Sequence, residues 1–107
     1  MIDIFPEQIT KLPKVEVPGG VTIYLTKAES HVVYYLTAAE ELDYPPHAHA
    51  AQFAVVLEGR IDITTSEGTK SYCKGDRYCL PAGTEHCVKI HSGFAEVAYL
   101  DDPGYFG

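Results

Sequence analysis

Two short segments of this chain carry residues that could bind a metal ion. The first contains His47 and His49, with Gln52 soon after them, and the second contains His86. Side chains two residues apart on an extended strand point to the same face, so both imidazoles of the first segment can approach one point. Solvated or core-packed histidines also occur in such pairs, and the elements around them have to decide between these interpretations.

The rest of the chain alternates β-rich runs with turns. The predicted strands span residues 21–26, 31–37, 52–57, 60–65, 69–73, 77–80, 88–91 and 94–100. Glycine-containing turns separate several of these runs, and none has the periodicity of an amphipathic helix. The pattern predicts an all-β sandwich or barrel.

The length of 107 residues fits one domain with a modest core. Residues 1–18 contain three prolines and are predicted to form an N-terminal arm, with a helical turn near residues 7–10, that packs on the barrel or on a partner subunit. Residues 19–107 are predicted to form the barrel.

Both faces of the predicted strand 52–57 are apolar. Ala54 and Val56 lie on the side of Gln52, and Phe53 and Val55 lie on the opposite side. A barrel wall exposed to water would alternate polar and apolar residues. We therefore expect the outer face to be covered by the N-terminal arm or by a second subunit, and we predict a homodimer.

Charge and composition exclude several kinds of partner. The net charge is -7, with only eight Lys and Arg residues, which argues against nucleic acid and against an anionic membrane surface. No apolar run reaches the ~18 residues of a membrane span, and the first residues do not resemble a signal peptide, so a cytoplasmic location is expected. The three cysteines lack a Cys-x-x-Cys pair and are expected to be free, buried residues.

The second histidine segment matches a known motif in full. Gly75, Pro81, Gly83 and His86 follow the pattern of a glycine, five residues, Pro-x-Gly, two residues and a histidine, and Ile90 replaces the asparagine that ends the motif. This pattern resembles the second motif of the cupin superfamily.

The first segment resembles the first cupin motif, with three departures. His47 and His49 match its His-x-His, and Gln52 stands seven residues before Gly59 in the place of the family's glutamate. The opening glycine is missing, and the gap after His49 is one residue short. Gln52 can be a polar residue hydrogen-bonded to water, or its amide oxygen can be a fourth ligand; its register with Gly59 favours the ligand.

The resemblance implies a fold, a site and a class of function. The fold is a double-stranded β-helix, or jelly-roll barrel. The implied ligands are His47, His49, His86 and Gln52, around one divalent Zn, Ni, Fe, Mn or Cu ion. The implied function is a metal-dependent enzyme acting on a small hydroxy-carbonyl or sugar-like molecule, of isomerase or ring-opening type. The alternatives are a metal-dependent dioxygenase and a non-catalytic module that binds or senses a small molecule. No catalytic acid or base stands out in the sequence.

Overall fold

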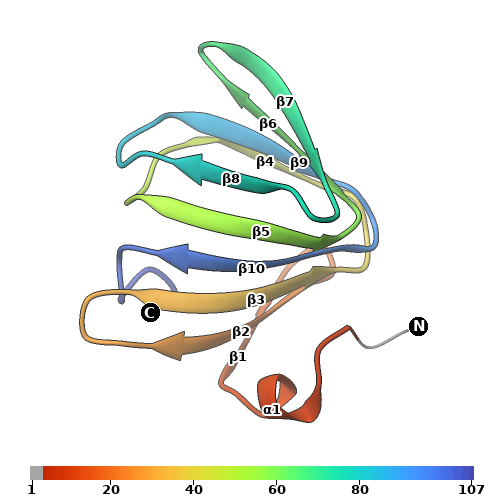
Figure 1. Ribbon diagram of the computed structural model, residues 1–107, viewed down its shortest axis with the longest axis vertical. Helices are drawn as coiled ribbons and strands as arrows, with labels where there is room; N and C mark the ends of the chain where they lie inside the picture. The colour runs from red at the N-terminus through yellow and green to blue at the C-terminus, as the bar shows by residue number, and fades with distance from the viewer. Residues whose placement is uncertain (1–3) are drawn as a thin grey trace.

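The computed structural model describes residues 4–107, which form two sheets and one short helix (Figure 1). The elements are α1 (Glu7–Thr10), β1 (Lys14–Val17), β2 (Val21–Lys27), β3 (Val32–Ala38), β4 (Leu42–His47), β5 (Gln52–Glu58), β6 (Arg60–Thr65), β7 (Gly68–Cys73), β8 (Arg77–Leu80), β9 (His86–Ile90) and β10 (Phe94–Leu100). The all-β prediction is confirmed. No helix among these residues is long and apolar enough to cross a membrane.

The two antiparallel sheets pack face to face around one core. The six-stranded sheet has the order β1-β2-β3-β10-β5-β8, and the four-stranded sheet has the order β4-β9-β6-β7. Strands distant in the sequence therefore become neighbours, as β10 does between β3 and β5. Alternate residues of both sheets point inward, which is why Val32, Val56 and Ile61 are almost fully buried.

The outer face of the six-stranded sheet is only partly covered. Phe5, which precedes α1, is 5 % exposed and packs edge-on against Tyr24 of β2 and Tyr35 of β3. On β5 the predicted alternation is confirmed, because Gln52 is buried while Phe53 is 43 % exposed. The face around β5 and β10 thus keeps apolar side chains on the surface.

Two strands lie where the sequence predicted none. β1 belongs to the segment expected to be irregular, and it pairs with β2. β4 contains Pro45 and Pro46, yet it forms an edge strand, where proline is tolerated because only one side needs N–H donors. A register shift separates Tyr44 from His47 in its pairing with β9, at the two prolines.

The cysteine prediction was half right. All three cysteines are free, as expected, but Cys73 and Cys79 are exposed and Cys87 is partly buried. Cys79 has the outward parity on β8, between the buried Tyr78 and Leu80. The general burial tendency of cysteine was therefore overridden by strand alternation.

Candidate metal centre

The three motif histidines meet where the two sheets end at the same side of the molecule. His47 is the last residue of β4 and His86 is the first residue of β9, and the two are direct cross-strand partners. His49 lies in the connection between β4 and β5, and its carbonyl accepts a 2.9 Å hydrogen bond from the Gly83 N–H. That bond ties the two motif segments together.

Backbone geometry in the turn before His86 depends on glycine. Gly83 has φ +78°, in the left-handed region that other residues rarely adopt. This conformation lets the turn after Pro81 reach the carbonyl of His49 before β9 begins. The Pro-x-Gly pattern therefore positions the histidines without taking part in the chemistry.

The imidazoles form a compact cluster. One ring nitrogen from each of His47, His49 and His86 lies within 4.8 Å of the others. Ring centroids are 4.4 Å apart for His47 and His86, and 4.8 Å apart for His49 and His86. Metal–nitrogen bonds of ~2.1 Å allow ligand nitrogens at most about 4.2 Å apart, so a small inward movement of the rings would fit a metal. The three side chains could hold a metal ion.

Hydrogen bonds to the backbone determine which ring nitrogen each histidine presents. In each case Nδ1 lies 2.8 Å from a carbonyl oxygen: His47 to Pro45, His49 to Ala50 and His86 to Thr84. A carbonyl only accepts, so Nδ1 must carry the proton and donate it, which leaves Nε2 as a free lone pair. Ligating histidines in metal proteins are oriented in this way.

His86 is the deepest of the three, at 3 % exposure. Burial lowers the pKa of His86, as do the neighbouring His47 and His49, while the hydrogen bond to Thr84 acts in the opposite direction. The neutral imidazole, which is the form that binds metals, is therefore favoured.

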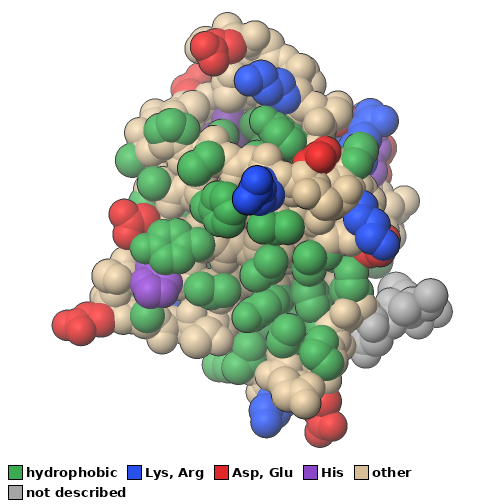
Figure 2. Space-filling view, in the orientation of Figure 1, with side chains coloured by type: hydrophobic (Ala, Val, Ile, Leu, Met, Phe, Trp, Pro, Cys, Tyr) green, Lys and Arg blue, Asp and Glu red, His purple; other side chains and the backbone are tan. Residues whose placement is uncertain are grey.

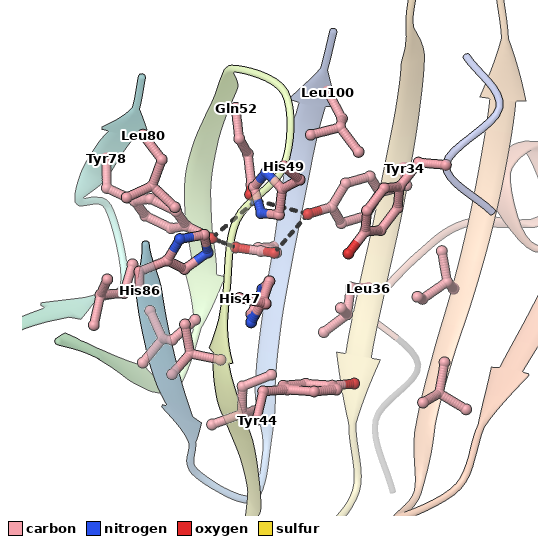
Figure 3. A pocket seen from close by; sticks show the side chains of 18 of the residues that line it. Tyr34, Leu36, Tyr44, His47, His49, Gln52, Tyr78, Leu80, His86 and Leu100 are labelled. Atoms are coloured by element: carbon pink, nitrogen blue, oxygen red, sulfur yellow. Dashed lines mark hydrogen bonds between the residues drawn. The ribbon is translucent and has the colours of Figure 1, made fainter. Parts of the chain in front are cut away.

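The cluster opens into an interior cavity of about 290 Å³. Its wall is mostly apolar, with side chains such as Ile23, Leu36 and Ile61 from both sheets. Figure 3 shows Leu36, Leu80 and Leu100 around the same cavity as the histidines. Near the histidines, Tyr105 stacks edge-on to His49, with ring centroids 5.6 Å apart. The site is thus a mostly apolar chamber with the histidines on one side.

A hydrogen-bonded polar group in this wall consists of Gln52, Tyr34, Tyr78 and Glu96. Gln52 Nε2 donates to the Tyr34 hydroxyl at 2.7 Å and to the Tyr78 hydroxyl at 3.4 Å. Tyr78 donates to Glu96 Oε1 at 2.5 Å, and Tyr34 lies 3.5 Å from Glu96 Oε2. Two short bonds and two long ones close a ring, which we call the polar ring. All four residues are buried.

Glu96 is the residue that the sequence analysis missed. Burial raises the pKa of Glu96 to about 7, although the hydrogen bonds from Tyr78 and Tyr34 act in the opposite direction. Burial and the nearby Glu96 also raise the pKa of both tyrosines well above 10, so their hydroxyls stay protonated. A lone charged residue at the inward parity of the apolar strand 94–100 was the available clue.

The structure brings together the residues that were singled out as ligands. The three histidines form the cluster, and Gln52 lines the same cavity. The two remaining histidines, His31 and His91, lie outside this cluster. His31 stacks on Tyr99 with centroids 4.6 Å apart, and His91 Nε2 lies 2.8 Å from Asp62 Oδ2.

Solved structures with a similar fold include cupins and an enzyme with Mn(II) centers. An RmlC-like cupin from Shewanella frigidimarina aligns with a TM-score of 0.76 at 16% identity, covering 95% of this chain and 92% of that one. KdgF from Halomonas sp. aligns at 0.76 and 13% identity, covering 92% and 95%. Oxalate decarboxylase from Bacillus subtilis, whose Mn(II) centers have been described, aligns at 0.74 and 15% identity. The aligned part covers 91% of this chain but only 29% of that enzyme.

These likenesses confirm the predicted jelly-roll fold. A comparison with curated protein sequences finds no match. The Cupin domain family, however, matches residues 32–101, which include every residue of the histidine cluster and of the polar ring. This chain belongs to the cupin family.

Proposed function

We propose that the chain binds one divalent transition metal ion through His47, His49, His86 and Gln52, and that it is a metal-dependent enzyme. The proposed substrate is a small hydroxy-carbonyl or sugar-like molecule, and the proposed reaction is an isomerisation or ring opening. The observation that carries the proposal is the shared orientation of the imidazoles, each with Nδ1 bonded to a carbonyl and Nε2 free. Three free Nε2 atoms that lie close together are what a metal site of histidine ligands requires.

The donor set suits several metals. Three imidazoles and an amide oxygen fit Zn, Ni, Fe, Mn or Cu. A divalent ion held there would act as a Lewis acid on a carbonyl or hydroxyl oxygen. The comparison with oxalate decarboxylase, a cupin-like fold with Mn(II) centers, supports a metal in this position.

Glu96 supplies the proton chemistry in this proposal. It is the carboxylic acid among the described residues that line the cavity. A pKa of about 7 lets it take up or release a proton near neutral pH, as a general acid or base should. Tyr78 holds one carboxylate oxygen at 2.5 Å, so the direction of the other oxygen is restricted. The apolar wall keeps bulk water from competing with the substrate.

Metal content tests the first part of the proposal. Purified wild type should contain about one metal ion per chain, and a His49→Ala/His86→Ala double variant should contain none. His31→Ala is the matched control, because His31 stacks on Tyr99 away from the cluster, and it should keep the metal. Equal metal content in all three proteins would refute the site.

Reaction class is tested with the zinc-loaded protein in the absence of oxygen. Turnover of hydroxy-carbonyl compounds should persist, because a neutral ligand set leaves the full charge of the ion to stabilise a developing enolate or alkoxide. Strict dependence on oxygen and on a redox-active metal would favour the dioxygenase alternative. Saturable binding of such compounds without turnover would favour a binding module.

We also propose a homodimer formed through the outer face of the six-stranded sheet. Phe53 and Tyr99 are cross-strand partners there, 43 % and 38 % exposed, and Figure 2 shows hydrophobic side chains gathered over this side of the molecule. Light scattering should find two chains per particle for wild type and one for Phe53→Lys. Ser92→Lys, which adds the same charge in an exposed turn, should stay dimeric. A monomeric wild type would refute the dimer.

The cysteines support a reducing compartment, and we propose the cytoplasm. Cys73 and Cys79 are exposed and unpaired. Exposed free thiols persist where glutathione and thioredoxin keep them reduced. Fractionation of the cells that produce the protein would test this location directly.

A further inference from the structure

The polar ring connects the buried carboxyl of Glu96 to the amide of Gln52. We propose that Glu96 is a positioning residue: through Tyr34 and Tyr78 it holds the Gln52 amide with its nitrogen inward and its oxygen open to the cavity. The inference rests on the proposed function, in which that oxygen is the fourth ligand. It adds a residue to the site that neither cupin motif contains.

Counting donors and acceptors determines the orientation of the amide. An ionised carboxylate only accepts, so Tyr78 must donate its hydroxyl proton to Glu96, at 2.5 Å, and Tyr34 is directed toward the other oxygen at 3.5 Å. Each hydroxyl has one proton, and both are then used. Towards Gln52 the tyrosines can only accept, so they must face its NH2 group, as the 2.7 Å and 3.4 Å contacts show. The charge on Glu96 thereby decides which end of the amide points inward.

The Gln52 oxygen is left without a partner by this arrangement. Among residues 4–107 no hydrogen bond to this oxygen is found. Every fully buried side-chain oxygen in that part of the chain has a hydrogen-bond partner, so the Gln52 oxygen is not fully buried. The oxygen must therefore keep contact with the cavity, whose lining it shares with the three histidines. An amide oxygen can bind a cation, whereas the NH2 end cannot.

The strand register explains why these four residues can meet. Tyr34, Ala98, Ala54 and Tyr78 lie opposite one another in a row across β3, β10, β5 and β8. The two alanines in the middle leave room for the tyrosine rings to lean toward each other. Glu96 precedes Ala98 by two residues and Gln52 precedes Ala54 by two, and because β10 and β5 are antiparallel they flank the row on opposite sides.

Removing the charge should release the amide. In Glu96→Gln the new amide can donate as well as accept, so the hydroxyl of Tyr78 is free to turn its proton toward Gln52. The Gln52 amide can then rotate and present its NH2 group to the metal. The variant also removes a negative charge near the ion. Loss of such an outer-shell partner typically lowers metal affinity about 10- to 100-fold.

The first measurement uses the metal-free protein at pH 8, where a pKa of about 7 leaves Glu96 mostly ionised. In wild type, the side-chain amide protons of Gln52 should show nuclear Overhauser effects to the ring protons of Tyr34 and Tyr78. Glu96→Gln should weaken or lose them. Glu67→Gln, which removes the same charge from an exposed turn, should keep them. Unchanged effects in Glu96→Gln would overturn the proposal.

The second measurement is Co²⁺ affinity by competition with a chelator, together with the visible spectrum of the complex. Glu96→Gln should bind about tenfold more weakly than wild type with an altered spectrum. In a Gln52→Leu background the same substitution should change the affinity less than about threefold, since the amide is already gone. Equal losses in both backgrounds, or affinity within twofold of wild type, would overturn the proposal.

Two further controls keep the outcomes separate. Should Glu96→Gln fail to fold, the double variant Tyr34→Phe/Tyr78→Phe removes both hydroxyls that accept from Gln52 while keeping the carboxylate, and it should lose the same Gln52 contacts; unchanged contacts would count against the proposal. Should wild type take up no Co²⁺ while its Gln52 amide is held as described, the proposed metal function fails and the positioning by Glu96 stands.

Discussion

Replacing Glu96 by glutamine should remove a specific pH dependence of stability from the metal-free protein. The carboxyl has a pKa of about 7 in the folded chain, against 4.5 as its ordinary value, because it is buried. A tenfold change in an ionisation constant corresponds to about 1.4 kcal/mol. The ionisation of Glu96 should therefore cost the folded state about 3 kcal/mol at alkaline pH.

The sign of the effect follows from which state holds the proton. Between pH 4.5 and 7 the folded chain keeps the Glu96 proton that the unfolded chain has released, so the free energy of unfolding falls as pH rises. Glu96→Gln has no such proton. Its stability relative to wild type should rise by up to about 3 kcal/mol between pH 4.5 and 8. The lowered pKa of His86 has the opposite slope, but both proteins share it and it cancels in the difference.

Urea unfolding with a chelator present, at several pH values from 4.5 to 8, measures this difference. Glu67→Gln serves as the control, since Glu67 is exposed, and its curve should stay parallel to that of wild type. A constant difference between Glu96→Gln and wild type over this range would show that Glu96 titrates as an ordinary carboxyl. The acid–base role that we assign to it would then lose its basis.

Three other predictions concern the rest of the molecule. The hydrogen bond from Arg60 holds the pKa of Asp62 far below its usual range, so the ionised carboxyl stabilises the fold above about pH 4. In calorimetry, Asp62→Asn should therefore lose less thermal stability than wild type as the pH falls below about 4. Gly59→Ala should lower the free energy of unfolding in urea by about 2 kcal/mol or more, because φ is +74° and a Cβ would lie 2.8 Å from the Phe94 backbone. Gly68→Ala is the control: a Cβ there would meet open space, so the loss should be smaller. Zn²⁺ affinity measured by calorimetry should fall below about pH 6.5, where protons compete for the histidines, and a flat profile would contradict histidine ligation.

The histidine cluster was predicted from the two cupin motifs taken together, because the spacing of His47 and His49 alone left other interpretations open. The Pro-x-Gly turn does place His86 at the start of a strand, but β4 ends at His47, so His49 lies in the connection and not on the same strand. What the spacing could not predict was β4, because two prolines argue against a strand until its edge position is known. The cross-strand pairing of His47 with His86 depends on that strand.

The polar ring could not be predicted in the same way, because its members are related only by the order of strands in the sheet. Tyr34, Gln52, Tyr78 and Glu96 come from β3, β5, β8 and β10, which are neighbours in space but widely separated in the chain. The alternation of side chains along each strand predicts that each of them points inward. It does not predict their partners, because many inward polar residues form hydrogen bonds with water or the backbone instead. The sheet order shows that they satisfy one another instead.

The same arrangement changes the electrostatic interpretation of Gln52. From the sequence, glutamine in place of a carboxylate leaves the charge of the metal ion without a counter-charge. The structure places a carboxyl, Glu96, two hydrogen bonds away from that amide. In the proposed site the four ligands would therefore be neutral, while the negative charge lies one layer further out, on a titratable carboxyl that lines the cavity. In the proposed function, a metal ion held in part by Gln52 would polarise the carbonyl and Glu96 would move the proton, so the two tasks would fall on separate groups.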